Sequence, residues 1–451
     1  MIRDFTKGPI LSQLILFALP LMGANLLQIV YNMVDMAVIG QFDGKIGLSA
    51  VSVGGEVLTL ITFFAVGFST AGQVILSQMI GAGRRDRISA TIGTMFVVLL
   101  TGAVVISVVC GICVRPMLDA MNTPPEAFSA ALQYARICSS GLIFIYGYNL
   151  IGAILRGMGD SRHPFLFIGL ATVVNLGLDL LFVAGFQLGP AGAALATILG
   201  QGTSFICSLV LLYRRRAAFG FDFQRSSFQV DREILLQLLK LGLPMSLQSA
   251  AVTISIIFVS SFLNEYGVVV SAVSGLGFKV CTIISVITMA LASAGSSIVG
   301  QNLGAGKNER VSCFFWLSLR INVCVAAVFS CITLLFPRFV FGIFTNDTAV
   351  LDMGMTFLPC AVLDYFGFAL RSPTNSIVNG SGHARFNLFM GVMDGIVCRV
   401  SIALFLGIVM DMGVQGFWYG SALAGFVPFL IGFGFYLSGK WRQSNDVKGR
   451  T

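Results

Sequence analysis

Long apolar runs recur along the whole 451-residue sequence and constrain its fold more than any other feature. A helix needs roughly 20 apolar residues to cross a hydrocarbon core about 30 Å thick, and the chain has room for about twelve such crossings. Only 11% of its residues are charged, whereas soluble domains carry about 25%. The runs are continuous rather than alternating, which excludes an outer-membrane barrel. We therefore predict an all-α polytopic membrane protein whose helices span residues 10–39, 47–79, 88–114, 127–155, 163–186, 190–213, 234–263, 268–302, 311–336, 348–378, 384–409 and 413–438.

Lysine and arginine are distributed unevenly over the loops between these runs. The loops on the side of the N-terminus hold most of them, including Arg84, and the C-terminal tail adds Lys448, whereas the opposite loops hold only Lys45, Arg115 and Arg338. Because basic loops stay in the cytoplasm, we predict a multi-pass protein of the inner (cytoplasmic) cell membrane with both termini cytoplasmic. This bias accounts for most of the net charge of +8, so we expect no nucleic-acid partner.

Several short motifs occur twice, about 223 positions apart. The segment from Gln78 to Arg87 (QMIGAGRRDR) recurs from Gln301 to Arg310 (QNLGAGKNER), and a Leu-Pro pair ends at both Pro20 and Pro244. A fixed period indicates duplicated units, here two six-helix bundles, and because six is even they are parallel repeats. We predict an N-terminal lobe at residues 1–213, a cytoplasmic linker at 214–233 and a C-terminal lobe at 234–451.

Two such lobes around a central cavity are typical of alternating-access carriers. The sequence has no G-x-x-x-x-G-K-[ST] phosphate loop, so we expect an ion gradient rather than ATP to drive transport. It has no H-E-x-x-H or nucleophile-elbow motif, and its two histidines, His163 and His383, fall in short turns. We predict a secondary transporter and not an enzyme, with no cofactor. The alternative is a membrane scaffold or receptor that does not transport.

Ionisable side chains inside apolar spans mark functional sites because burying a charge in the bilayer is costly. In the N-terminal lobe these are Asp35 and Asp179; Asn175 lies one turn before Asp179 on the same helix face, and Thr197 offers a hydroxyl at a similar depth. Oxygen ligands suit a small cation, and burial beside a like charge favours a protonated carboxyl group. We predict that these four residues bind the coupling ion, H⁺ or Na⁺, with Na⁺ the only metal ion expected. The alternative is that the two aspartates form structural ion pairs with Arg136 or Lys279.

The repeat provides an internal control for this site. The positions of the second half that correspond to Asp35, Asn175 and Asp179 hold Val259, Cys398 and Ile402, none of them a carboxylate. We therefore expect the cation site to be confined to the N-terminal lobe.

The C-terminal lobe has buried charges of its own. One interpretation is that its aspartates and arginines form structural ion pairs, and the other is that they bind substrate or a cation, Asp364 above all. Both interpretations concern the same residues: Lys279, Asp364, Arg371, Asp394 and Arg399.

A proline interrupts the first helix. Pro20 lies roughly four turns before Asp35, and a proline frees a backbone carbonyl and lets a helix bend. We predict a hinge at Pro20 whose bending is coupled to protonation of Asp35, with a static kink as the alternative.

Taken together, these features make the sequence resemble the multidrug and toxic compound extrusion (MATE) transporters over essentially the whole chain. The resemblance rests on the 6+6 duplication, the two Q-x-x-G-A-G-[RK] turns and the turn from Arg156 to Asp160 (RGMGD). It implies the MATE (MOP-type) fold, a V-shaped pair of bundles that exports amphipathic, often cationic, drugs in exchange for H⁺ or Na⁺. It also implies that Asp35, Asn175, Asp179 and Thr197 correspond to the N-lobe cation site of the DinF-like members, and Pro20 to their first-helix proline.

The resemblance supports a C-lobe cation site less well. NorM-type members use a glutamate on helix seven and an aspartate on helix ten, whereas helix seven here has only Glu265 at its outer end and Asp364 matches loosely. We expect small amphipathic organic molecules and the lipid bilayer as partners, and no obligate protein partner. The nearest alternative function is a lipid-linked oligosaccharide flippase of the same superfamily, whose anionic substrate would need the cations Lys279, Arg371 and Arg399.

Overall fold

The computed structural model describes residues 3–121, 123–342, 345 and 347–442, and these residues form helices with no strand. Eleven helices are long and apolar enough to cross a membrane, and the pair α4 and α5, bent by 49° at Gly141, makes up to twelve. The predicted all-α fold with twelve membrane-spanning helices is thereby confirmed. The tail that carries Lys448 lies outside the described residues.

The helices of the first half and of the linker follow the predicted spans closely. They are α1 (Ile10–Phe42), α2 (Gly44–Gly81), α3 (Asp86–Ala120), α4 (Pro125–Ser140), α5 (Leu142–Gly157), α6 (Arg162–Asp179), the π-helix η1 (Leu180–Gly185), α7 (Gly189–Arg214), α8 (Arg216–Phe219) and the 3-10 helix η2 (Arg225–Phe228).

The second half repeats this order with additional breaks. Its elements are α9 (Arg232–Glu265), α10 (Val268–Gly304), α11 (Asn308–Leu335), α12 (Pro337–Gly342), α13 (Thr348–Gly380), α14 (Ala384–Val392), the π-helix η3 (Met393–Arg399), α15 (Val400–Leu404), the π-helix η4 (Phe405–Val409), α16 (Gly413–Ala424), α17 (Val427–Leu437) and the 3-10 helix η5 (Lys440–Arg442).

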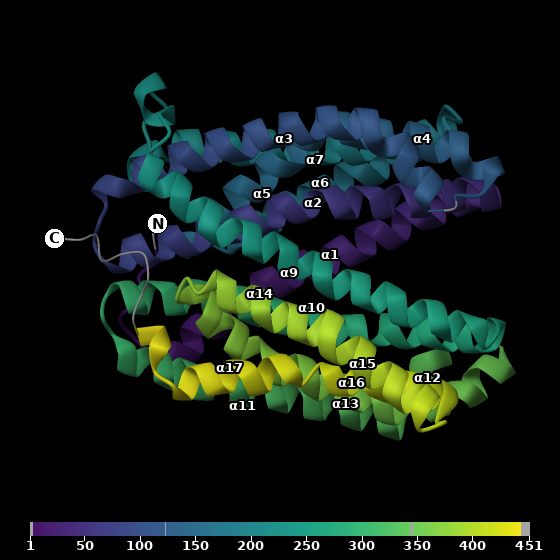
Figure 1. The fold of residues 1–451 in the computed structure, drawn as a ribbon. Coiled ribbons are helices and arrows are strands. Elements are labelled where there is room, and N and C mark those ends of the chain that lie inside the picture. The colour runs from purple at the N-terminus through teal and green to yellow at the C-terminus, as the bar shows by residue number, and fades with distance from the viewer. Residues whose placement is uncertain (1–2, 122, 343–344, 346, 443–451) are drawn as a thin grey trace. The chain divides into compact units, whose positions relative to one another are not determined.

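Contacts divide the chain into two compact units. Unit 1 contains residues 3–4 and 19–246, and unit 2 contains residues 5–18 and 247–442. The linker and the start of α9 thus belong to unit 1, while the start of α1 belongs to unit 2. Both helices change unit within a few residues of an internal proline, Pro20 in α1 and Pro244 in α9. Within unit 1, α2 packs on α3, α4 and α5; within unit 2, α13 packs on α10 and α11 (Figure 1).

The two copies of the Q-x-x-G-A-G-[RK] turn bind the chain at the starts of α1 and α9. In unit 2, the Arg310 guanidinium donates from Nη2 to the Phe5 carbonyl at 3.1 Å, and Lys307 donates from Nζ to the Thr6 carbonyl at 2.8 Å. The Phe5 amide in turn donates to Gln301 Oε1 at 2.9 Å. The residues just before α1 are therefore anchored to the turn between α10 and α11.

Unit 1 contains the matching arrangement. Arg87, which corresponds to Arg310, lies 3.0 Å from Asp231 Oδ2 through Nη1 and also pairs with Glu233. Asp231 caps the start of α9, because its Oδ1 accepts the Glu233 amide at 2.9 Å. We call the two turns the clasps: residues 78–87 bind the start of α9 and residues 301–310 bind the segment before α1.

Small residues allow the helices to approach each other closely, as membrane helices require. A Cβ on Gly416 or Gly420 of α16 would lie 2.5 Å or less from the backbone of Leu406 or Ala403. In unit 1, a Cβ on Gly200 of α7 would lie 3.0 Å from the Ala171 carbonyl of α6. In both halves, the sixth span is thus packed tightly on the fifth.

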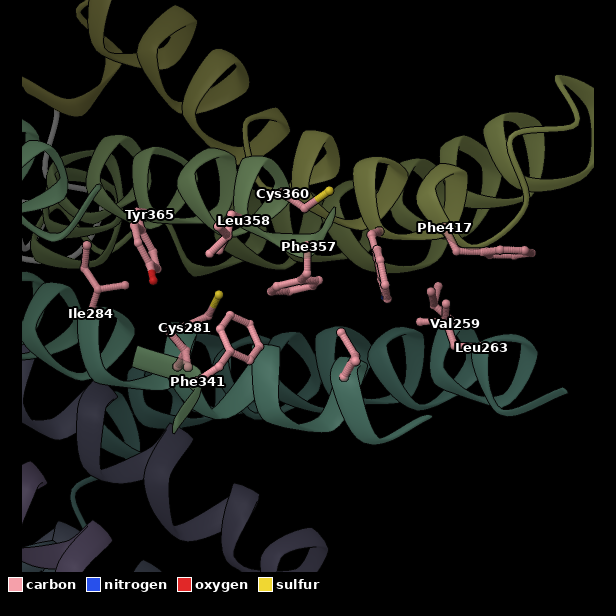
Figure 2. Close-up of a cluster of buried hydrophobic side chains, with 14 of the residues drawn as sticks. Val259, Leu263, Cys281, Ile284, Phe341, Phe357, Leu358, Cys360, Tyr365 and Phe417 are labelled. Carbon is pink, nitrogen blue, oxygen red and sulfur yellow. The ribbon is translucent and has the colours of Figure 1, made fainter. Parts of the chain in front are cut away.

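The apolar core of unit 2 joins α9, α10, α13 and α16. Figure 2 shows Val259 of α9, Cys281 of α10, Phe357 of α13 and Phe417 of α16 directed towards a common interior. The Phe357 ring meets Trp418 edge to face, with centroids 5.2 Å apart. Val259, which by the repeat corresponds to Asp35, is part of this apolar core.

Candidate functional site

A polar cavity of about 370 Å³ lies within unit 1, between α1, α2, α4, α5 and α7. It is lined by hydroxyl, amide and carboxyl groups in a segment of the chain that is otherwise apolar. These polar lining residues are Gln28, Tyr31, Asn32, Asp35, Ser52, Glu56, Thr59, Thr62, Tyr134, Thr197 and Gln201.

Asp35 enters the cavity from α1. It is only 6% exposed, and its Oδ1 has no hydrogen-bond partner among the described residues. Tyr31 lies one turn earlier on the same face of α1, and its hydroxyl donates to Thr197 Oγ1 of α7 at 3.0 Å. This hydrogen bond joins the first and sixth spans beside the Asp35 carboxyl group.

Asp179 and Asn175 lie behind the cavity wall on α6. Asp179 is fully buried, and neither of its carboxyl oxygens has a hydrogen-bond partner in the described part of the chain; the same is true of Asn175 Nδ2. The Asp179 carboxyl group nevertheless interacts electrostatically with Asp35. Gly200 makes room for this layer, because a Cβ there would lie 3.1 Å from the Asn175 Cβ.

A π-helix follows directly on Asp179. The α-helical hydrogen bonding of α6 ends at this residue, and η1 continues the span to Gly185. Single π-turns within helices occur often at functional sites. Sequence periodicity did not predict this feature.

The structure does not support the ion-pair alternative for these aspartates within unit 1. Arg136, the candidate partner from the same unit, is exposed to the surroundings. Neither Asp35 nor Asp179 forms an ion pair with any described residue of that unit. Two buried carboxyl groups without a counter-charge need a proton or a cation to be stable in a low-dielectric interior.

The four residues predicted to bind the ion supply two carboxyl groups, one hydroxyl group and one side-chain amide. Carboxylate, carbonyl and hydroxyl oxygens are ligands for hard cations, and a carboxyl group can instead hold a proton. Among the described residues, no group of three or more His, Cys, Asp or Glu side chains is arranged to hold a metal ion. The residues fit a proton or a weakly held monovalent cation better than a tightly bound divalent metal.

The charged residues of unit 2 are arranged differently. Asp394 is buried between two arginines: its Oδ2 lies 3.0 Å from Arg371 Nη1 and its Oδ1 lies 2.9 Å from Arg399 Nη2. Arg399 also donates from Nη1 to the Ser421 hydroxyl at 2.8 Å. Ser421 corresponds to Thr197 in the repeat, so a position that contacts a tyrosine in unit 1 contacts an arginine in unit 2.

Two members of the predicted C-lobe set lie outside this ion-pair network. Asp364 has no ion pair within 4.0 Å among the described residues, and its Oδ2 accepts only a long contact of 3.9 Å from the Cys281 thiol. Lys279 is exposed. The structure therefore brings together Arg371, Asp394 and Arg399.

Several lining residues were not singled out from the sequence. Tyr31, Gln28 and Gln201 are ordinary polar residues in apolar spans, and only their spacing could have indicated them. Tyr31 precedes Asp35 by four residues, and Gln201 follows Thr197 by four, which places each on the face of its predicted neighbour. Tyr134 shows no such spacing, because no predicted site residue lies on α4.

A duplicated helical membrane protein whose first half holds two buried carboxyl groups beside a polar cavity has the architecture of a membrane transporter. Comparison with known families agrees: the family model MatE matches residues 20–181 and 244–405, one match in each half. The probable multidrug resistance protein YpnP of Bacillus subtilis (strain 168) is 30% identical over 441 residues, which is 97% of both chains. The chain therefore belongs to the MATE family of transporters, and the prediction of a transporter rather than an enzyme is confirmed.

Other relatives and solved structures agree over the full length. The probable multidrug resistance protein NorM of Thermotoga maritima is 25% identical over 451 aligned residues, covering 96% of this chain and 93% of that protein. A multidrug resistance MATE family transporter of the MOP superfamily, solved in an outward-facing conformation, superposes with a TM-score of 0.90 at 22% identity and 98% coverage of both chains. At that identity the superposition supports the fold alone.

Proposed function

We propose that this protein is a secondary active antiporter that exports amphipathic, cationic small molecules in exchange for H⁺ or Na⁺. The observation that carries this proposal is the pair of buried carboxyl groups, Asp35 and Asp179, without a counter-charge beside the polar cavity of unit 1. The names of the relatives, multidrug resistance proteins, support small drug-like molecules as the substrate class.

The proposed coupling is competition for one negative charge. When the coupling ion occupies Asp35 and Asp179, it cancels one of their negative charges and weakens the electrostatic attraction for a cationic drug. When the ion leaves, the carboxylates attract the drug again. Two ligands that exclude each other from one site are thermodynamically coupled, and the coupling acts equally in both directions. Alternating access of this site to the two sides of the membrane then converts the ion gradient into export.

Each site residue has a role in this scheme. Asp35 and Asp179 hold the ion, Asn175 and Thr197 complete its shell, and Tyr31 fixes the Thr197 hydroxyl through the 3.0 Å hydrogen bond. This assignment corresponds to the DinF-like branch of the family. We place the protein in the cytoplasmic membrane with both termini inside the cell, from the basic bias of its loops.

The test is transport of a fluorescent cationic dye by purified protein in lipid vesicles, under a pH gradient or a Na⁺ gradient imposed separately. We expect one gradient to drive dye movement in the wild type. Asp35→Asn and Asp179→Asn should each reduce ion-driven transport to the background level, because an amide cannot exchange a proton or neutralise a cation. Both variants should still insert, as judged by the amount of monodisperse protein purified.

A matched control is Asp352→Asn, since Asp352 is an exposed carboxylate of unit 2. It should transport at the wild-type rate. Wild-type transport by either cavity variant would overturn the site assignment. Ion-independent movement of a lipid-linked pyrophosphate, with no dye transport, would favour the flippase alternative, against which the pairing of Arg371 and Arg399 with Asp394 already argues.

A further inference from the structure

A second cavity, of about 560 Å³, lies at one end of unit 1 and has no role in the antiport cycle. Phe96 and Leu100 of α3, Phe205 and Leu209 of α7, and Phe223 and Phe228 of the linker form its walls. The lining is apolar except at its rim, where Tyr213 and Arg214 end the α7 span. Phe205 lies nine residues before Arg214, so the cavity extends about 14 Å along the helix into the membrane.

The linker forms one wall of this cavity. Its segment 221–228 packs on α3 at Gly93, where a Cβ would lie only 1.7 Å from the Ser227 carbonyl oxygen. The next contact along the linker is the Asp231 amide, which donates to Thr94 Oγ1 at 3.1 Å. No side chain larger than glycine fits at position 93 without displacing the linker wall.

One of the wall residues is held in an unfavourable backbone conformation. Phe223 has a φ of +60°, a left-handed conformation that is rare for bulky residues and persists only where surrounding contacts fix it. Here aromatic packing does so: its ring lies 4.7 Å from Phe221 and 5.4 Å from Tyr213, both edge to face. These contacts hold Phe223 in the wall of the cavity.

Arg214 lines the rim, and three further arginines lie near it in the sequence: Arg215 and Arg216 directly after α7, and Arg225 in the linker. Arg214, Arg215 and Arg225 are exposed and form no ion pair with any residue in the described part of the chain. The guanidinium carbon of Arg216 lies 5.2 Å from the centre of the Tyr213 ring. The nearby carboxylate, Asp222, is engaged within the linker: hydrogen bonds from Ser227 and the Gln224 amide, together with Arg216, lower its pKa.

We propose that this cavity binds one anionic phospholipid of the adjoining leaflet. An acyl chain lies between Phe205 and Phe223, and the headgroup phosphate lies at Arg214 and the neighbouring Arg215 and Arg216. The chemistry of both parts fits. An apolar slot that opens at the end of a membrane span suits a lipid chain, and several unpaired arginines at the interface suit an anionic headgroup. A neutral lipid would fill the slot but leave the arginines without a partner.

The test uses a tryptophan placed at the rim. Tyr213→Trp keeps an aromatic ring under Arg216, and its fluorescence, after subtraction of the wild-type signal from the three native tryptophans, reports on lipid at the cavity. Vesicles contain brominated phosphatidylglycerol or brominated phosphatidylcholine at the same low mole fraction, since bromine quenches tryptophan on contact. We expect phosphatidylglycerol to quench several-fold more, because each arginine near an anionic lipid changes its binding by about fivefold.

Two variants separate the headgroup from the chain. The first is a triple variant in the Tyr213→Trp background: Arg214→Gln, Arg215→Gln and Arg216→Gln together should abolish the preference for phosphatidylglycerol. Its control is the double variant Arg84→Gln and Arg85→Gln, which removes exposed arginines elsewhere in unit 1 and should keep the preference. Leu209→Trp fills the slot without changing charge, and native mass spectrometry should then count less bound phosphatidylglycerol than in the wild type.

Three outcomes would overturn the proposal: equal quenching by the two lipids, a preference that survives the triple arginine change, or full displacement of the lipid by inorganic phosphate. The last would show that the arginines bind a free anion and that the slot contributes nothing. None of these measurements depends on dye transport, so the lipid site and the proposed antiport can fail separately.

Discussion

Asp394 is the residue whose charge is most strongly required by its surroundings. Its carboxylate compensates both Arg371 and Arg399 in a buried position of unit 2. Removing one partner of a buried ion pair leaves an uncompensated charge and costs about 3–5 kcal/mol. We therefore expect Asp394→Asn to lower the apparent Tm of the purified protein strongly.

The matched control for Asp394 is again Asp352. It pairs with Arg338 at 3.6 Å, but both side chains are more than two-thirds exposed, and exposed pairs contribute about 0–1 kcal/mol. Asp352→Asn should leave Tm nearly unchanged in the same thermal unfolding assay. Equal Tm shifts in the two variants would show that the buried charge of Asp394 contributes no more to stability than the exposed charge of Asp352.

His383 links stability to pH. It lies in the turn between α13 and α14, with Nδ1 2.9 Å from the Ser381 hydroxyl and its ring 5.0 Å from Phe435. Burial lowers the pKa of His383 below its usual value of 6.5, so the folded protein favours the neutral ring. The stability from this residue is fully present above pH 6.5 and is lost as the pH falls through the lowered folded-state value, because the unfolded chain binds the proton more readily.

The expected result is a difference between two pH profiles. Wild-type Tm should fall more between pH 7.5 and 5 than the Tm of His383→Gln, which cannot gain a charge in the turn. The comparison between the two proteins removes the contribution of every other titrating group. Parallel profiles would mean that His383 is not the acid-sensitive residue.

The site residues differ in how readily the sequence indicates them. Asp35 and Asp179 could be predicted because a carboxyl group inside an apolar run is rare and costly. Tyr31 has only its four-residue spacing from Asp35 to indicate it. Tyr134 could not be predicted, since a tyrosine in a membrane span is common and its role here depends on which helices meet around the cavity. The ion-pair interpretation covered both Asp364 and Asp394, and the fold shows that, among the described residues, Asp394 alone pairs with Arg371 and Arg399.

Among the helices, α16 approaches its neighbours closely enough that a side chain as small as alanine would not fit. A Cβ on Gly420 would lie 2.4 Å from the Ala403 Cα, and backbone atoms cannot move aside as a flexible side chain can. Inserting a methyl group into a packed interface costs about 1–3 kcal/mol. We expect Gly420→Ala to lower Tm, despite the higher helix propensity of alanine.

Gly434 of α17 provides the control for this prediction. No atom lies within 4 Å of a Cβ built there, so Gly434→Ala should be neutral or slightly stabilising in the same assay. A destabilised Gly434→Ala with an unchanged Gly420→Ala would contradict the packing argument.

Helix positions were predictable, but helix type was not. Apolar runs gave the spans to within a few residues because length and hydropathy determine which segments cross a bilayer. The π-helices η1 and η3, in contrast, follow or contain Asp179 and Asp394. The third π-helix, η4, contains no charged residue, so no local sequence pattern is common to the three.

At the scale of the whole molecule, α1 and α9 are the two helices shared by both units. Each changes unit next to a proline, which cannot donate a hydrogen bond to the carbonyl four residues earlier, Leu16 for Pro20 and Lys240 for Pro244. The chain passes from one unit to the other inside these two helices and between Asp4 and Phe5, so these are the places where a hinge can act. We expect Pro20→Ala to slow dye transport in vesicles, because the restored hydrogen bond stiffens the helix by about 1 kcal/mol.

The control is a proline inside a helix that stays within one unit. Pro359 of α13 meets this condition, and Pro359→Ala should transport at a rate closer to the wild type. Both variants are first compared for purified yield, so that a folding defect is not counted as slow transport. An unchanged rate in Pro20→Ala would favour a static kink over a hinge.

The clasps have a consequence for biosynthesis. Residues 5–18 leave the ribosome first, yet their partners in the 301–310 clasp are made some 300 residues later. The 78–87 clasp likewise waits for the start of α9. A cut in the linker before Asp231 would therefore separate each clasp from the segment that it binds. The N-terminal fragment would lack the start of α9, and the C-terminal fragment would lack residues 5–18. The first repeat therefore cannot complete unit 1 until the start of α9 has been made, and unit 2 needs residues 5–18 from the first repeat.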